Sequence, residues 1–152
     1  MAKTDRPLTE AERDEVENHL AIALGWFGDG ADSASPDQKQ QWIYETVNAL
    51  RSKPPAEKHE DGMTMTAITL GCLWGQAVCG QFGWEWAAVS LEPGAEFYGV
   101  VSPSRSHVVF PLHYMQELLS DPERDHTSLL LYNMLKAGSL PPASPGKYSA
   151  LG

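Results

Sequence analysis

Hydrophobic residues recur at helical spacing in the first third of the chain. Thr9 and Glu12 form the capping-box pattern that opens a helix. The apolar positions that follow lie three or four residues apart: Val16, Leu20, Ala23, Leu24 and Phe27. The stretch GWFGDGADSAS interrupts this pattern, and Ser35, Pro36 and Gln38 then supply an N-cap, a first-turn proline and a glutamine three residues after the cap. We therefore predict helices over about residues 9–25 and 36–51.

Residues 63–82 are apolar almost all the way round, which is typical of a helix buried on most sides. Small residues recur in this segment every four positions: Ala67, Gly71, Gly75 and Cys79. Glycine inside a helix costs about 1 kcal/mol relative to alanine, so the ridge indicates that another element approaches the backbone closely. The apolar run spans at most about 18 residues, contains Gln76 and lacks flanking Lys or Arg, so we expect a core helix and no association with a membrane.

The period changes from helical to alternating after Gly83. Trp84, Trp86 and Ala88 would lie on one face of a strand, with Glu85, Ala87 and Val89 on the other. The turn sequences EPGA at 92–95 and PSRS at 103–106 divide the following apolar segments, which predicts a three-stranded antiparallel meander. Two more helices follow, one opened by Pro111 and one over about 124–137, which ends at Gly138.

This order of elements predicts a single α+β domain over residues 1–138. Two N-terminal helices form an acidic part (residues 1–61), and a core part (62–138) holds the glycine-punctuated helix, the meander and two C-terminal helices. The tail, residues 139–152, is rich in Pro, Gly and Ser, and is either disordered or held by Tyr148 and Leu151. A chain of 152 residues with 42% hydrophobic content can bury such a core without metal or disulfide bonds.

The formal net charge is −9, and residues 1–61 carry −6 of it. A surface of this sign repels phosphate backbones, which disfavours nucleic acid as a partner, and attracts a basic protein. Acidity that only keeps a protein soluble is the commoner case. The N-terminus has neither a secretory nor a transit pattern, so we expect a cytoplasmic location, and Cys72 and Cys79 lie about 10 Å apart on the predicted helix, too far for a disulfide.

A search for catalytic patterns finds none with the required spacing. Cys72 lies within an apolar helix, which disfavours the reactive thiolate. The histidines lack metal-site spacing, and an exposed arrangement of His107, His113 and Glu117 is favoured over a metal site. Glu85 is expected to be solvent-facing or salt-bridged rather than a general acid. We therefore predict no catalytic residue, no metal and no cofactor.

A partner-binding surface is the remaining candidate site. Acidic side chains at Glu10, Asp14 and Glu17 would attract a basic partner, and aromatic residues framed by acids often form protein-binding patches. The aromatic candidates are Trp26, Phe27 and Trp42. For Trp26 and Phe27, the commoner alternative is that they cover the end of the first helix as a local hydrophobic cap.

Residues 63–120 resemble a family of small bacterial domains of unknown function. The resemblance is carried by an LGxxxG helix, a Gly-Trp strand, a Tyr-Gly hairpin and a strand that ends in proline before a helix; here these are Leu70, Gly71, Gly75, Gly83, Trp84, Tyr98, Gly99 and Pro111. This sequence departs from the pattern at Gln76, where Glu is expected more often. The resemblance implies a bacterial cytoplasmic protein, and some small acidic proteins of this build are immunity or partner proteins for secreted toxins.

Three functions follow, in order of preference. The first is a non-enzymatic protein-binding module, of immunity type or secretion-associated, that uses its acidic surface. The second is a hydrolase or other enzyme with a site dispersed over Glu85, Arg105, His107 and His113. The third is a structural module that forms homo-oligomers through Trp84 and Trp86 on an exposed sheet face.

Overall fold

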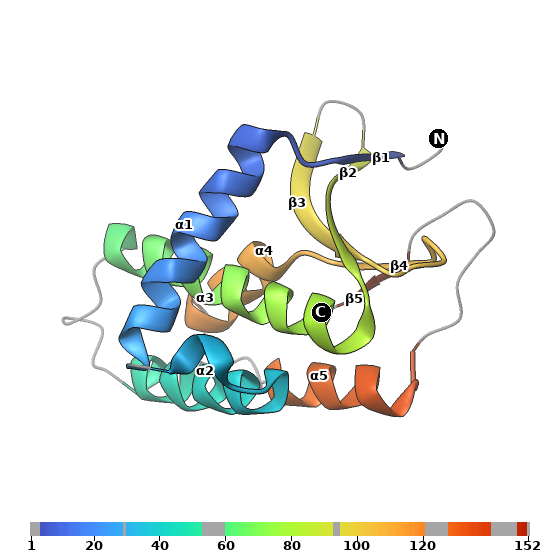
Figure 1. Ribbon diagram of the computed structural model, residues 1–152. Coiled ribbons are helices and arrows are strands. Elements are labelled where there is room, and N and C mark those ends of the chain that lie inside the picture. Colours follow the sequence, from blue (N-terminus) through green and yellow to red (C-terminus); the bar gives the residue numbers. More distant parts are fainter. Residues whose placement is uncertain are drawn as a thin grey trace.

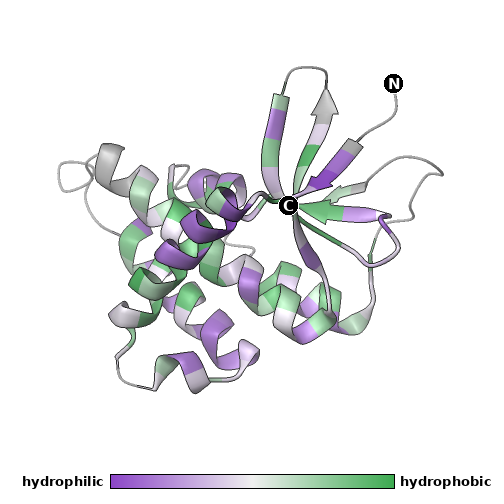
Figure 2. Ribbon diagram, turned by 45° about the horizontal axis from the view of Figure 1, so that its top comes forward, coloured by the Kyte–Doolittle hydropathy of each residue, from purple (hydrophilic) through white to green (hydrophobic). Residues whose placement is uncertain are grey.

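The computed structural model describes residues 4–28, 30–52, 60–92, 95–120, 128–140 and 149–151 and confirms the α+β class. The helices are α1 (Glu10–Trp26), α2 (Pro36–Arg51), α3 (Glu60–Phe82), α4 (Pro111–Ser120) and α5 (Ser128–Ala137), with a 3₁₀ turn at Ala31–Ser33. The strands are β1 (Thr4–Pro7), β2 (Glu85–Glu92), β3 (Ala95–Val101), β4 (His107–Val109) and β5 (Ser149–Leu151) (Figure 1). The helices gather on one side and the sheet on the other (Figure 2).

The first two helices begin as their capping signals predict. The backbone N–H of Glu12 donates to Thr9 Oγ1 at 3.2 Å, and the N–H of Thr9 donates to Glu12 Oε1 at 2.8 Å, which completes the capping box. Ser35 Oγ accepts the N–H of Gln38 at 3.1 Å. Helix α3 begins at residue 60, three residues before the predicted start. The predicted start of the last helix, near residue 124, lies outside the described residues.

The sheet is larger than the predicted three-stranded antiparallel meander. It has five strands in the order β1-β2-β3-β4-β5. The predicted strands β2, β3 and β4 are present, but β1 adds to the outer edge of β2 in antiparallel pairing and β5 adds to β4 in parallel pairing, so the sheet is mixed. The prediction was incomplete because both added strands are very short and pair with segments that are distant in the sequence.

The ends of the chain therefore contribute to the sheet. Residues 4–7 belong to the predicted acidic helical part, yet they pair with Ala87–Ser90 of the core part. In the predicted tail, Leu151 pairs with Val109 and packs, half-buried, against the main core. This agrees with a tail held by Leu151, whereas Tyr148 lies outside the described residues.

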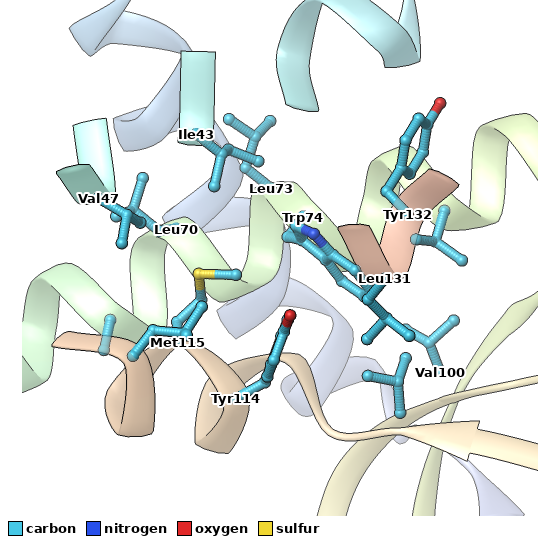
Figure 3. Packing of buried hydrophobic residues seen from close by; sticks show 14 of the residues in the cluster. Ile43, Val47, Leu70, Leu73, Trp74, Val100, Tyr114, Met115, Leu131 and Tyr132 are labelled. Atoms are coloured by element: carbon cyan, nitrogen blue, oxygen red, sulfur yellow. The ribbon is translucent and has the colours of Figure 1, made fainter. Parts of the chain in front are cut away.

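Helix α3 is the centre of the core. All its side chains from Ala67 to Val78 are buried except the half-buried Ile68 and the exposed Gln76, which confirms the predicted buried helix. Trp74 is fully buried among side chains from α2, α4 and α5 (Figure 3). Among the described residues, no helix combines the length and hydrophobicity needed to span a membrane.

The two tryptophans at the start of β2 do not form an exposed sheet face. Trp84 precedes the strand and is 9% exposed within the main core, and Trp86 is half-buried against two core clusters. The prediction of an oligomerisation surface on an exposed sheet face at Trp84 and Trp86 is therefore wrong. The alternating pattern was correct from Trp86 onwards, but α1 and α3 cover the face that it predicted to be open.

Candidate functional site

A groove of about 450 Å³ lies between α1, the end of α3 and the start of β2. We call it the α1–β2 groove. Its floor consists of buried or half-buried apolar side chains: Leu8, Val16, Leu20, Cys79, Trp84 and Trp86. Its rim carries exposed charged side chains: Asp5, Arg13, Glu17, Glu85 and Arg105. An apolar floor with a few polar groups around it is the usual composition of a binding site.

The groove exists because β1 is shorter than β2. Strand β1 ends at Pro7, opposite Ala87, so Glu85 and Trp86 pair with β3 on one side but not with β1 on the other. After Pro7 the chain turns into α1, whose Val16 packs with Leu8 in a core cluster beside Trp86. Helix α1 thereby forms one wall and the first residues of β2 form the other.

Trp86 is held in the floor from two directions. Its Nε1–H donates to Gln76 Oε1 at 3.2 Å, and both residues line the groove. Its ring lies against Gly75 of α3, where a Cβ atom would come within 2.6 Å of the ring. The predicted ridge of small residues thus admits the indole of Trp86, and the groove has a positioned aromatic surface.

An ion pair crosses the rim between β2 and the β3–β4 turn. Arg105 Nη2 lies 3.0 Å from Glu85 Oε2, with both side chains exposed, so the pair is worth about 0–1 kcal/mol. Arg105 has φ 59°, the one non-glycine residue with positive φ in the described part of the chain. This conformation costs roughly 1 kcal/mol. Ser102 Oγ supports the turn by accepting the N–H groups of Ser106 and His107 at 3.1 and 3.0 Å.

The predicted acidic residues form one stripe that meets the groove. Glu10, Asp14 and Glu17 are all exposed on α1. Spacings of four and three residues place them on the same helix face. Glu17 belongs to this stripe and also lines the groove, with Arg13 beside it. The acidic surface and the groove are therefore continuous.

The predicted aromatic residues lie elsewhere. Phe27 and Trp42 are half-buried and stacked, with ring centroids 5.1 Å apart and an interplanar angle of 11°. Trp26 is 48% exposed. It lies about two and a half helical turns from Glu17, on the opposite side of α1. The six predicted partner-binding residues thus do not form one surface: Phe27 packs as a local hydrophobic cap, and Trp26 does not.

The four residues of the alternative enzymatic site are only partly brought together. Glu85 and Arg105 form the ion pair at the groove, as expected for a salt-bridged Glu85. His107 Nδ1, at the start of β4, lies 2.8 Å from Oγ of the preceding Ser106. The His113 ring instead lies edge-to-face against Phe97, with centroids 4.6 Å apart, beside a separate hollow of about 180 Å³. Neither histidine lines the groove.

The cysteines do not have the environment of reactive thiols. Burial raises the pKa of Cys72 to about 12, with a smaller contribution from Glu15, and burial and then Glu85 raise the pKa of Cys79 to about 12. Both thiols are free. Among the described residues, no cluster of three or more His, Cys, Asp or Glu side chains is arranged to hold a metal ion.

Sequence reasoning missed several groove residues. Leu8 lies between β1 and α1, Arg13 on α1 and Gln76 on α3, and the three have no motif in common. The polar Gln76 within the apolar run was a signal, since it is an exposed residue on an otherwise buried stretch of helix.

Comparisons of the chain with protein-family models, with curated proteins and with solved structures found no significant match. The resemblance to small bacterial domains therefore stays a prediction, and the site is interpreted from its geometry and charge.

Proposed function

We propose that this chain is a non-enzymatic protein-binding module that recognises a basic partner through the acidic stripe of α1 and the adjoining α1–β2 groove. The observation that carries the proposal is the position of Glu17, which belongs to both features. An acidic stripe alone would steer a partner without orienting it. An apolar groove beside it supplies area for tight contact, as at the centre of specific interfaces.

An immunity-type or secretion-associated role in the cytoplasm is the biological setting that we favour. The support is the net charge of −9 and the resemblance of residues 63–120 to small bacterial domains. In this role the protein would neutralise or accompany a basic protein by covering part of its surface.

The test is affinity capture from a lysate of the source organism at low and high salt. The variant pair Asp14→Lys/Glu17→Lys reverses the stripe, and Asp32→Lys/Glu45→Lys makes the same charge change at exposed positions elsewhere. Glu10 is left unchanged because a carboxylate in the first turn stabilises the helix. We expect the stripe variant to bind the captured partner about tenfold or more weakly at low salt, with the control unchanged.

Each outcome of this experiment bears on the proposal. Equal loss in both variants would show a general charge effect and contradict the use of this surface. A wild-type protein that retains no protein at either salt concentration would count against protein binding altogether. Thermal unfolding of each variant establishes that the folded protein is being compared.

A further inference from the structure

The size and floor of the α1–β2 groove suit a short run of side chains. A volume of about 450 Å³ lies within the range of roughly 300–1,000 Å³ of sites that enclose ligands. Leu8, Val16 and Leu20 provide aliphatic contact, and the indoles of Trp84 and Trp86 provide flat surfaces. Apolar side chains would gain from leaving water here.

The charges around the groove favour a cation. Three carboxylates, on Asp5, Glu17 and Glu85, line it against two guanidinium groups, and Arg105 already pairs with Glu85. The rest of the acidic stripe continues away from Glu17 on exposed α1. Arginine suits this setting better than lysine, because its planar guanidinium pairs with carboxylates and stacks on indole rings.

Arg105 is held in a way that allows replacement. The ion pair between Arg105 and Glu85 joins side chains that are 44% and 67% exposed, so water competes with it on both sides. Arg105 comes from a turn with positive φ, not from a strand or helix. An incoming arginine could pair with Glu85 while Arg105 moves into solvent.

We propose that the α1–β2 groove binds an extended segment of a basic protein in which an arginine stands between apolar side chains, and that this arginine replaces Arg105 beside Glu85. The proposal rests on the proposed function of protein binding and names the chemistry of the partner. The apolar neighbours of the arginine contact the floor, and its guanidinium lies between Glu85 and Glu17.

The probe is the peptide acetyl-Ala-Leu-Arg-Leu-Ala-amide, titrated into ¹⁵N-labelled protein and followed by the indole N–H signals. Trp84 and Trp86 report on the groove, the fully buried Trp74 reports on general disturbance, and Trp26 reports on the far side of α1. We expect saturable shifts at Trp84 and Trp86 only. A peptide with citrulline in place of arginine should bind about fivefold more weakly, since it keeps the shape without the charge.

Variants at Gln76 test the role of charge. Gln76 is exposed and lines the groove, so Gln76→Glu adds a carboxylate and Gln76→Lys adds a cation at the same place. Gln76→Glu keeps an acceptor for Trp86 Nε1–H and is the cleaner of the two, because Gln76→Lys also removes that acceptor. We expect peptide affinity to rise about threefold with the first and fall about threefold with the second. Arg105→Ala should raise affinity by a similar factor, because Glu85 no longer has a competing partner.

Several results would overturn the proposal. These are the absence of any shift, shifts at Trp26 instead, equal binding of the citrulline peptide, or unchanged or weaker binding by Arg105→Ala. Equal affinity for L-arginine amide would make the groove a small-molecule site. If wild type and Gln76→Lys capture the same partner equally well, the groove inference fails, and protein binding through the acidic stripe alone is the part of the proposed function that stands. If the peptide binds as expected but no partner is captured, the proposed function fails instead.

Discussion

Gly75 of α3 lies so close to Trp86 of β2 that a Cβ atom at this glycine would come within 2.6 Å of ring atoms Cη2 and Cζ2. One turn earlier, a Cβ atom at Gly71 would lie 2.8 Å from the carbonyl oxygen of Pro111. The two glycines therefore admit different neighbours, an indole ring and the first turn of α4. The close approach expected from the small-residue ridge is confirmed at both positions.

Alanine at these glycines should destabilise the protein. We expect Gly71→Ala to lower the free energy of unfolding by about 2–3 kcal/mol, because backbone must move, and Gly75→Ala by about 1–3 kcal/mol, because a side chain can shift. Urea unfolding measures both. Gly80 is the control: it is exposed, and an added Cβ atom would lie 4.0 Å from Pro36 Cγ, so Gly80→Ala should stabilise the protein by about 0.5–1 kcal/mol. Stable Gly71 and Gly75 variants would contradict the tight packing.

Glu12 should contribute stability that depends on pH. Hydrogen bonds from Arg6 and then from the Thr9 backbone lower the pKa of Glu12 from its usual 4.5 to about 2. Because the folded pKa is the lower one, the stabilisation is present above about pH 4.5 and is lost as the pH falls toward 2. We expect Glu12→Gln to lower the free energy of unfolding by about 1 kcal/mol at pH 7.

Urea unfolding at pH 7, 5, 4 and 3 tests this dependence. The gap between wild type and Glu12→Gln should narrow below pH 4.5. The control is Asp14→Asn on the same helix, which removes a carboxylate that makes no ion pair with any residue in the described ranges. A gap that stays constant across the series would show that the charge of Glu12 is not what stabilises the fold.

The hydrogen bond from the Tyr132 hydroxyl to Asp37 should stabilise the packing of α5 against α2. The hydroxyl donates to Asp37 Oδ1 at 2.6 Å, and Tyr132 is 1% exposed. Tyr132→Phe should cost about 1–2 kcal/mol, because Asp37 loses a short bond from a buried donor. Tyr98→Phe removes a comparable bond of 2.8 Å to Glu15 at a half-buried position, where water can substitute, and should cost under about 1 kcal/mol. Equal costs would contradict this dependence on burial.

Both cysteines should resist thiol reagents in the folded protein. A pKa of about 12 for Cys72 and for Cys79 leaves roughly 10³-fold less thiolate near pH 8 than an ordinary cysteine has. Iodoacetamide labelling followed by mass spectrometry should be slow for the native protein and fast in urea. Rapid native labelling of Cys79, which lines the groove, would show that the groove opens further than the structure indicates.

Signals that act within a few residues predicted most of the fold. The N-cap signals, the proline and glycine stops and the change from helical to alternating period located α1, α2 and the meander, because each depends on contacts between near neighbours in the chain. Charge and spacing likewise predicted the acidic stripe of Glu10, Asp14 and Glu17.

Tertiary packing decided the rest. Strands β1 and β5 are too short to show an alternating pattern in the sequence. Their backbone groups are satisfied by pairing with β2 and β4. Trp84 and Trp86 showed an alternating pattern, but which face of a sheet is covered depends on helices from other parts of the chain. The groove arises where β1 stops short of the start of β2 and α1 packs alongside, a relationship between segments about 80 residues apart that no local pattern encodes.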